Sequence, residues 1–258
     1  MGIFNTLVST FAPAFLVLSP LTSYTDQILS IHRTRTSAGF SLDIPLIMLT
    51  ASVLKIFYWP GAHYDLSLLV QALVMLGVQC TLLKVALDNR PGWRVDGGVP
   101  FAGEKASGHE GRPWGFWRWR NQRPYWEFLL FLTFSLVVMH VILQPTPYTQ
   151  QFYTNLLGYV GLAIEATLPL PQMLSNYQSR SCKGFRVSVL ANWLLGDAMK
   201  MSFFFASDGG KVPWAFKACG CFQAACDAML GVQYWMYGEG QPESEVFREK
   251  EKDLRIPR

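Results

Sequence analysis

The sequence PLPQMLSNYQSRSCKGFRVSVLANWLLGDAMK, residues 169–200, contains the pattern on which the fold depends. It opens with Pro169 and Pro171 inside an apolar segment, passes through a short basic turn, and continues as a second apolar segment that carries Asp197 and Lys200. Proline lacks a backbone donor and clashes with the preceding helical turn. The first segment is therefore predicted to break at its prolines.

The same pattern occurs earlier in the chain, because residues 20–59 align without a gap onto residues 165–204. The identical pairs are Thr22 and Thr167, Gln27 and Gln172, Leu29 and Leu174, Ser30 and Ser175, Arg35 and Arg180, Gly39 and Gly184, Phe40 and Phe185, Leu49 and Leu194, and Lys55 and Lys200. Two unrelated apolar helices share fewer residues through composition alone. The chain is therefore predicted to contain a duplicated unit.

The motif in this unit carries a resemblance to a known family. Gln172 after Pro171, followed by the turn RSCKGF at 180–185, resembles the PQ-loop motif of the SWEET and cystinosin-like membrane proteins. The first copy departs from the motif, because Asp26 replaces the proline before Gln27. The segments KIFYW at 55–59 and LGDAMK at 195–200 resemble one branch of the family. That branch holds the animal PQ-loop repeat-containing protein 1 and the fungal endosome/Golgi PQ-loop phospholipid scramblase.

The composition is consistent with a membrane protein and excludes several other classes. Half of the chain is apolar and 16% is charged, and charges are nearly absent from blocks of about 20 residues, the length that spans a bilayer core. The formal charge of +4 comes without a basic face for nucleic acid. The 5 cysteines do not form a zinc pattern, and no cofactor is expected.

These apolar blocks predict an all-α integral membrane protein with seven transmembrane helices. The blocks are residues 4–31, 42–59, 66–87, 126–143, 152–177, 187–206 and 212–237. The predicted parts are a first three-helix repeat (1–87), a cytosolic Gly-rich and Trp/Arg-rich loop (88–125), a linker helix (126–143), a second repeat (152–237) and a cytosolic tail (238–258). Because each triplet has an odd number of helices, one inversion linker makes the two repeats parallel.

Loop charges predict the orientation of the chain. Lys and Arg gather in the first, third and fifth loops and in the tail, whereas the second and fourth loops contain none. The positive-inside rule then places the N-terminus in the lumen and the C-terminus in the cytosol. The family resemblance implies Golgi or endosomal membranes.

The third loop contains a stretch that is typical of a membrane surface, because tryptophan rings can lie among lipid headgroups with guanidinium groups toward the phosphates. Its residues are Trp114, Trp117, Arg118, Trp119 and Arg120. The alternative interpretation is an ordinary flank of the following helix.

Ionisable residues inside membrane segments usually line a path or pair with one another. Lys55 and Lys200 are equivalent under the repeat, and Asp197 lies at i−3 from Lys200 on one helical face. We predict a polar groove between the two triplets. Its predicted lining is Lys55, Asp197, Lys200, Glu165, Asn192, Gln79, Gln223 and Asp227. The alternative is that Lys200 extends toward the lumenal surface, partly neutralised by Asp197.

The proline breaks have two interpretations. As hinges, they let a triplet rock or open the groove on the cytosolic side. As static kinks, they are stabilised by Thr22, Thr167 and neighbouring helices. The residues concerned are Pro20, Asp26, Gln27, Pro169, Pro171 and Gln172.

The function expected from the resemblance and the groove is an energy-independent phospholipid scramblase that is not an enzyme, with bilayer phospholipids as its partners. The first alternative is a proton-coupled exporter of a small, amino acid-like solute from an acidic organelle. Asp227 resembles an acidic position in the last helix of the cystine transporter, whereas Trp193 stands where another acidic residue is expected. The second alternative is a scaffold that recruits trafficking or flippase-related proteins through the loop and the tail.

Overall fold

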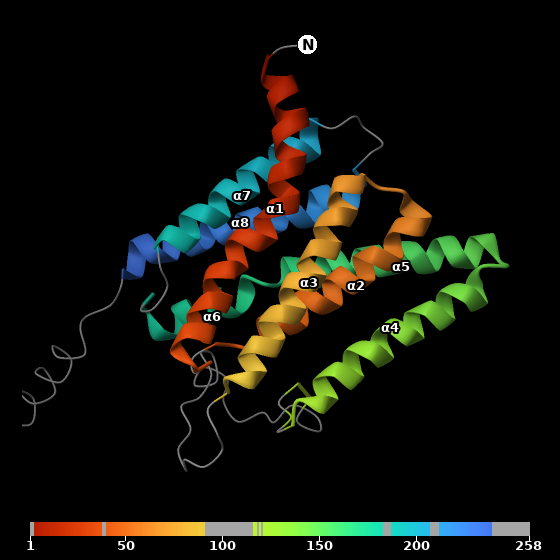
Figure 1. The fold of residues 1–258 in the computed structure, drawn as a ribbon. Helices are drawn as coiled ribbons and strands as arrows, with labels where there is room; N and C mark the ends of the chain where they lie inside the picture. Colours follow the sequence, from red (N-terminus) through yellow and green to blue (C-terminus); the bar gives the residue numbers. More distant parts are fainter. Residues whose placement is uncertain are drawn as a thin grey trace, which may run out of the picture.

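Every regular secondary-structure element in the described part of the chain is an α-helix. The computed structural model describes residues 3–37, 40–90, 116–117, 119, 121–182, 187–206 and 212–238. Its helices are α1 (Ile3–Thr34), α2 (Asp43–Ala62), α3 (Leu66–Asp88), α4 (Arg123–Leu143), α5 (Pro147–Ala166), α6 (Leu170–Ser179), α7 (Val187–Ala206) and α8 (Trp214–Tyr237), as drawn in Figure 1. The predicted all-α class is confirmed, and each predicted segment corresponds to one helix or, for the fifth, to the pair α5 and α6.

The helices pack as two similar groups. In the first group α3 contacts both α1 and α2, and in the second group α8 contacts α7 as well as α5 and α6. The groups meet where α2 packs against α5 and where α1 packs against α7. Since the repeat alignment makes α1 equivalent to α5–α6 and α2 equivalent to α7, these two interfaces are the same contact repeated. The arrangement agrees with a duplicated three-helix unit.

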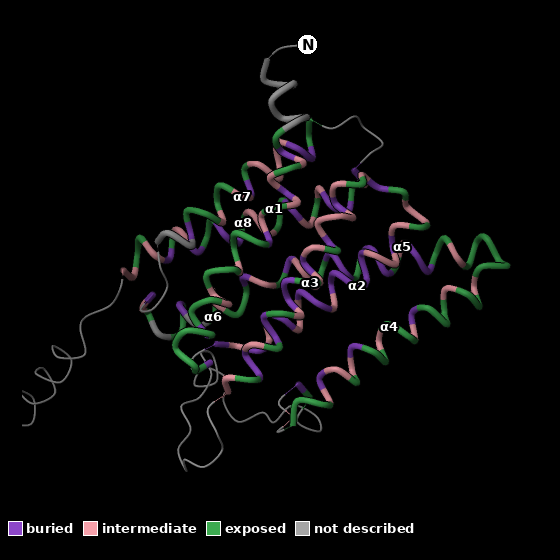
Figure 2. Tube along the Cα trace, in the orientation of Figure 1, coloured by how far each residue is buried: buried purple, intermediate pink, exposed green. Residues whose placement is uncertain are grey.

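The helix between the two groups, α4, has the least protein around it. It makes limited contacts with α5 and α2, and Figure 2 shows most of its length as exposed or intermediate. Its exposed residues include Leu130, Phe131, Phe134, Val141 and Ile142. Such a surface is unfavourable in water and suits a lipid environment. The position of α4 between the groups in sequence agrees with its predicted role as linker helix.

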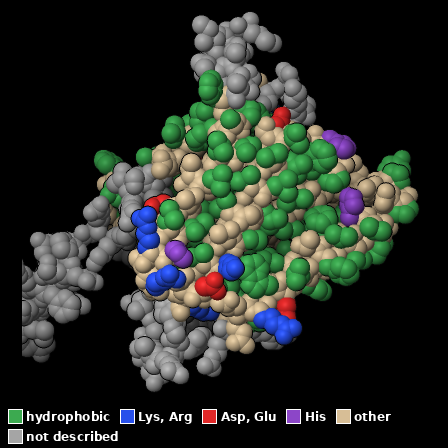
Figure 3. Space-filling model, in the orientation of Figure 1, with side chains coloured by type: hydrophobic (Ala, Val, Ile, Leu, Met, Phe, Trp, Pro, Cys, Tyr) green, Lys and Arg blue, Asp and Glu red, His purple; other side chains and the backbone are tan. Residues whose placement is uncertain are grey.

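Three described helices, α2, α3 and α4, are long and apolar enough to cross a membrane on length and composition alone. The other long helices carry more polar residues, among them Asp197 and Lys200 in α7 and Asp227 in α8. Figure 3 shows hydrophobic side chains over most of the visible face, and most of its charged side chains lie on the lower part. In the same orientation, α1 and α3 end and α4 begins near that part (Figure 1).

The two copies of the proline region differ. In the second copy the chain leaves α5 at Ala166 and resumes as α6 at Leu170, as predicted. In the first copy α1 continues through Pro20, so the predicted break there is wrong. A single proline frees one carbonyl, that of Leu16, and the Ser19 hydroxyl donates to it at 3.0 Å.

The equivalent threonines Thr22 and Thr167 act alike in both copies. The Thr22 hydroxyl donates to the carbonyl of Ser19 at 3.0 Å, and the Thr167 hydroxyl donates to that of Ile164 at 2.6 Å. Ser19 and Ile164 are themselves equivalent under the repeat. These bonds fit the expectation that threonine hydroxyls stabilise the backbone near the prolines.

Two glycines bring α5 close to α2. A Cβ atom added to Gly158 would lie 2.6 Å from the Tyr58 ring, and one added to Gly161 would lie 2.9 Å from Leu54 Cβ. Small residues let helix backbones approach closely in membranes. The glycines therefore permit the contact that joins the two groups of helices.

Trp117 differs from its predicted position at a membrane surface. Its side chain is 1% exposed, and its Nε1 donates to the carbonyl of Leu42 at 2.6 Å. The ring packs against Tyr125 and Phe128 of α4. Trp117 therefore ties the start of α4 to the start of α2 inside the protein. Trp119 is half-buried in the same cluster, while Trp114, Arg118 and Arg120 lie outside the described residues.

Candidate translocation site

A buried ion pair joins the two repeats. Lys55 of α2 lies 2.6 Å from Glu165 of α5, measured from Nζ to Oε2, and the two side chains are 6% and 16% exposed. The close approach of α2 and α5 at Gly161 allows this contact, since Gly161 precedes Glu165 by about one helical turn. The Lys55 carbonyl accepts a hydrogen bond from the Tyr64 hydroxyl at 2.9 Å. The sequence predicted both charges in the site but not their pairing.

The equivalent lysine of the second repeat has a different set of partners. Lys200 Nζ donates to Gln223 Oε1 of α8 at 3.0 Å and lies 3.5 Å from Asp197 Oδ1 on its own helix. The predicted i−3 pairing of Asp197 with Lys200 is therefore present. Residue 20 aligns with Glu165 and is a proline, so α1 supplies no carboxylate to Lys200 at that position.

Both lysines face one small cavity between the repeats. Its volume is about 30 Å³, which is room for water but not for a lipid headgroup. The polar residues that line it are Lys55, Gln71, Glu165, Lys200 and Gln223, and the remaining lining is mainly apolar side chains of α3, α5, α7 and α8. Four of the predicted groove residues thus meet in one place. In this conformation the site is closed.

Asp197 and Asp227 lie beside the cavity lysine of the second repeat. Asp227 is 3% exposed and interacts electrostatically with both Asp197 and Lys200. Asp197 precedes Lys200, and Asp227 follows Gln223, by about one helical turn each. α7 and α8 run in opposite directions. Asp197 and Asp227 therefore lie on the same side of Lys200 and Gln223, each about one helical turn away.

Two predicted groove residues lie elsewhere. Asn192 is exposed on α7, and Gln79 is fully buried in α3, where its Nε2 contacts Met75 Sδ at 3.6 Å. Gln71, on the same helix, takes the place in the cavity that was predicted for Gln79. The two glutamines are rotated by about a quarter turn relative to each other on α3. Sequence polarity marks both residues, but Gln79 lies about 12 Å further along the axis of α3 than Gln71, away from the level of the cavity.

The predicted hinge residues are distributed between the interior and the surface. Pro20 and Pro169 are buried, Asp26 and Pro171 are exposed, and Gln27 is half-buried. In the second copy, Gln172 Nε2 donates to Asn176 Oδ1 at 2.8 Å inside α6. Motion at these residues stays a prediction.

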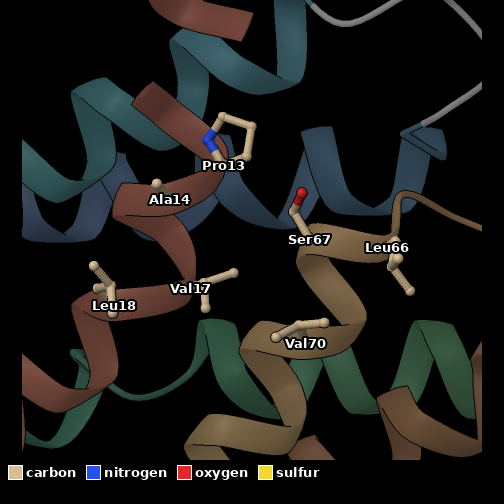
Figure 4. A pocket seen from close by; sticks show the side chains of 7 residues that line it. All are labelled: Pro13, Ala14, Val17, Leu18, Leu66, Ser67 and Val70. Atoms are coloured by element: carbon tan, nitrogen blue, oxygen red, sulfur yellow. The ribbon is translucent and has the colours of Figure 1, made fainter. Parts of the chain in front are cut away.

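A second, larger cavity is an apolar groove between α1 and α3, with a volume of about 380 Å³. Figure 4 shows its lining residues, which are Pro13, Ala14, Val17, Leu18, Leu66, Ser67 and Val70. Along α3, the apolar groove occupies the same helical turns as Leu68 and Gln71, which line the polar cavity. The groove carries no charged side chain and is suited to hydrocarbon.

No group of three or more His, Cys, Asp or Glu side chains that could hold a metal ion occurs within the described ranges. The polar contacts observed at the site are buried ion pairs and an amide hydrogen bond. Such groups bind and release charged or zwitterionic species.

The sequence is similar to a known repeat family and to a known protein. Residues 153–210 match the PQ loop repeat family. The chain is 28% identical, over 278 aligned positions, to the protein named Scramblase ANY1 of Saccharomyces cerevisiae, and the alignment covers 85% of this chain and 68% of the yeast protein. The matched repeat contains the prolines, Glu165, Asp197 and Lys200. Residues 153–210 of this chain are therefore similar to a PQ loop repeat, and most of the chain is similar to a protein named as a scramblase.

Proposed function

We propose that this protein is an energy-independent phospholipid scramblase that moves lipid headgroups through the polar site between its two repeats. The observation that carries the proposal is the meeting of Lys55, Glu165 and Lys200 around one buried cavity at the repeat interface. Buried charges at membrane depth mark transport paths, and the similarity to a scramblase indicates lipid as the substrate.

The chemistry of the site suits a headgroup. A phospholipid headgroup needs a cation for its phosphate and acceptors for its amine. Lys200 has the looser set of partners, with one neutral amide and one carboxylate at 3.5 Å, and is the proposed phosphate ligand. Lys55 is held at 2.6 Å by Glu165 and is the proposed clamp between the repeats. The acyl chains stay in hydrocarbon while the headgroup passes.

The cavity has to widen for this transport, because about 30 Å³ does not admit a headgroup. The interruption between α5 and α6 is the proposed hinge, since the backbone there already departs from one continuous helix. The proposed setting is a Golgi or endosomal membrane with a lumenal N-terminus and a cytosolic C-terminus. The gathering of charged side chains on one part of the surface in Figure 3 supports a defined orientation.

The decisive experiment uses purified protein in liposomes with fluorescent phospholipids and no ion gradient. Dithionite quenches only the outer leaflet, so quenching well beyond half of the signal reports scrambling. We expect this for the wild type and expect Lys200→Leu to suppress it. Quenching that stops at the outer leaflet with folded wild-type protein contradicts the proposal.

A proton-coupled exporter of a small, amino acid-like solute is the second candidate. The buried carboxyl groups of Asp197 and Asp227 favour it, since neighbouring carboxyl groups can share and release a proton. Solute uptake into the same liposomes, driven by a pH gradient, would support this function if lipid transport is absent.

A further inference from the structure

The wall of the polar cavity combines one acid with two lysines. Glu165 is the only acidic side chain among the described residues that line it. Its Oε2 lies 2.6 Å from Lys55 Nζ, and the charge of Lys200 also acts on it. The cavity of about 30 Å³ has room for water alone. In this closed conformation the Glu165 carboxylate therefore supplies the negative charge of the cavity wall.

The charges around the cavity are balanced in pairs. Asp197 lies 3.5 Å from Lys200 Nζ and is hydrogen-bonded to Asp227. A hydrogen bond between two carboxyl groups needs a shared proton, so these two residues together carry one negative charge, which balances Lys200. Glu165 balances Lys55. An anion that enters the cavity avoids an excess of buried negative charge if it replaces Glu165, the carboxylate that lines the wall.

Glu165 also lies at the proposed hinge. It is the residue before the last of α5, next to the interruption that separates α5 from α6. Its carbonyl accepts a hydrogen bond from the backbone N–H of Leu168 at 3.1 Å, in the turn that joins the two helices. Lys55 lies within the continuous helix α2. A change of backbone conformation at the interruption therefore moves the carboxylate relative to Lys55.

The acid belongs to one copy of the repeat, whereas the lysine belongs to both. Lys55 and Lys200 are equivalent under the repeat, and the residue equivalent to Glu165 is Pro20. The helix α1 folds with this proline at that position. The repeated unit therefore does not depend on an acid there for its fold.

We propose that Glu165 is an internal substitute for the phosphate of a lipid headgroup, and that the phosphate replaces it beside Lys55 and Lys200 during transport. This inference rests on the proposed scramblase function and adds the chemical group that the site recognises. A phosphodiester and a carboxylate each carry one negative charge and oxygen acceptors for a lysine ammonium group. The exchange therefore preserves the charge of the site and makes no demand on the amine of the headgroup.

The binding test uses glycerophosphocholine, a soluble phosphodiester headgroup without acyl chains, and thermal unfolding of the detergent-purified protein. Glu165→Gln is expected to melt below the wild type, because Lys55 loses its counter-charge. Glycerophosphocholine should raise the melting temperature of this variant, with a half-maximal shift at about a tenfold lower concentration than in the wild type, since no carboxylate has to be displaced. Glu127→Gln, in an exposed ion pair of α4, is the matched control and should respond as the wild type does.

A second variant keeps the test valid if Glu165→Gln does not fold. Glu165→Asp retains the charge on a shorter side chain and should shift the half-maximal concentration in the same direction by a smaller factor. Equal half-maximal concentrations in the wild type and the Glu165 variants overturn the inference. Equal stabilisation by glycerol with choline chloride, which lack phosphate, overturns it as well. A response to inorganic phosphate but not to glycerophosphocholine assigns the site to free phosphate and also rejects the inference.

A transport measurement tests the substrate class in the dithionite assay. The lipids are tail-labelled phosphatidylcholine, phosphatidylethanolamine and glucosylceramide. The wild type is expected to move the two phospholipids at similar rates and the glycolipid, which has no phosphate, about tenfold more slowly. Equal rates for all three lipids overturn phosphate recognition and leave the scramblase intact. If no lipid crosses but glycerophosphocholine gives the expected shifts, the scramblase proposal fails and the phosphate site is supported.

Discussion

The Nζ atom of Lys55 lies 2.6 Å from Oε2 of Glu165, and this contact joins α2 of the first repeat to α5 of the second. Both side chains are largely buried, so each charge needs compensation, and Lys200 also contributes positive charge near Glu165. The pair lies at the wall of the polar cavity, where Lys200 of the other repeat is also found. The stability of the repeat interface and the chemistry of the site are therefore linked through one ion pair.

Removing one partner of this pair should destabilise the protein strongly. Lys55→Leu leaves the Glu165 carboxylate buried without its cation, and breaking a buried pair costs about 3–5 kcal/mol. The double variant Lys55→Leu with Glu165→Leu removes both charges and should recover most of that loss. Thermal unfolding in detergent measures both effects. A double variant that is less stable than Lys55→Leu would contradict the role of the pair as a clamp.

The two equivalent lysines should differ in transport. Lys200→Leu should lower the scrambling rate about tenfold or more, because the proposed phosphate ligand is lost. The Lys55 and Glu165 double leucine variant should keep most of the rate, since it leaves Lys200 and Asp197 in place. Initial rates in the dithionite assay, corrected for the amount of reconstituted protein, make the comparison. Equal losses in both variants would mean that the repeats contribute alike.

The interface between α2 and α5 should be sensitive to the size of residue 161. Gly161→Val places a side chain against Leu54 Cβ and 3.3 Å from the Ala51 carbonyl, and such overpacking costs about 1–3 kcal/mol. Gly77→Val is the matched control, because a Cβ atom at Gly77 meets nothing within 4 Å. The melting temperature should fall for the first variant and stay nearly constant for the second. A similar fall in both would indicate a general effect of β-branching in these helices.

Filling the apolar groove between α1 and α3 should slow lipid movement if acyl chains occupy it during transport. Val70→Trp introduces a large ring among the groove residues. Leu73→Trp places the same ring on an exposed position of the same helix and serves as control. Scrambling should fall severalfold only for Val70→Trp, with unchanged melting temperatures for both. Unaltered scrambling in Val70→Trp would show that the groove is not on the lipid path.

Trp117 should contribute to stability rather than to membrane binding. Trp117→Ala removes a buried ring and its hydrogen bond to Leu42, and the expected loss is about 3–5 kcal/mol. Phe116→Ala, at a residue with 37% exposure, should cost less. Unfolding in detergent measures the difference. A larger loss for Phe116→Ala would contradict the structural role of Trp117.

The sequence by itself determined the membrane class, the duplicated unit and the types of residue in the site. Apolar block lengths, the alignment of residues 20–59 with 165–204, and charges inside apolar blocks are local patterns that need no tertiary contact. The break between α5 and α6 was also local, because two nearby prolines remove donors from the same stretch of helix. The same reasoning failed at Pro20, where a single proline fits within a continuous helix.

Only the tertiary structure decided which of the predicted residues meet. The level at which α3 meets the cavity selects Gln71 instead of Gln79, and the rotation of α7 leaves Asn192 exposed while Asp197 is buried. The pairing of Lys55 with Glu165 depends on two helices from different repeats that approach at Gly161. Helix rotation and interhelical distance come from packing between segments far apart in the chain, and composition and periodicity within one segment do not encode them.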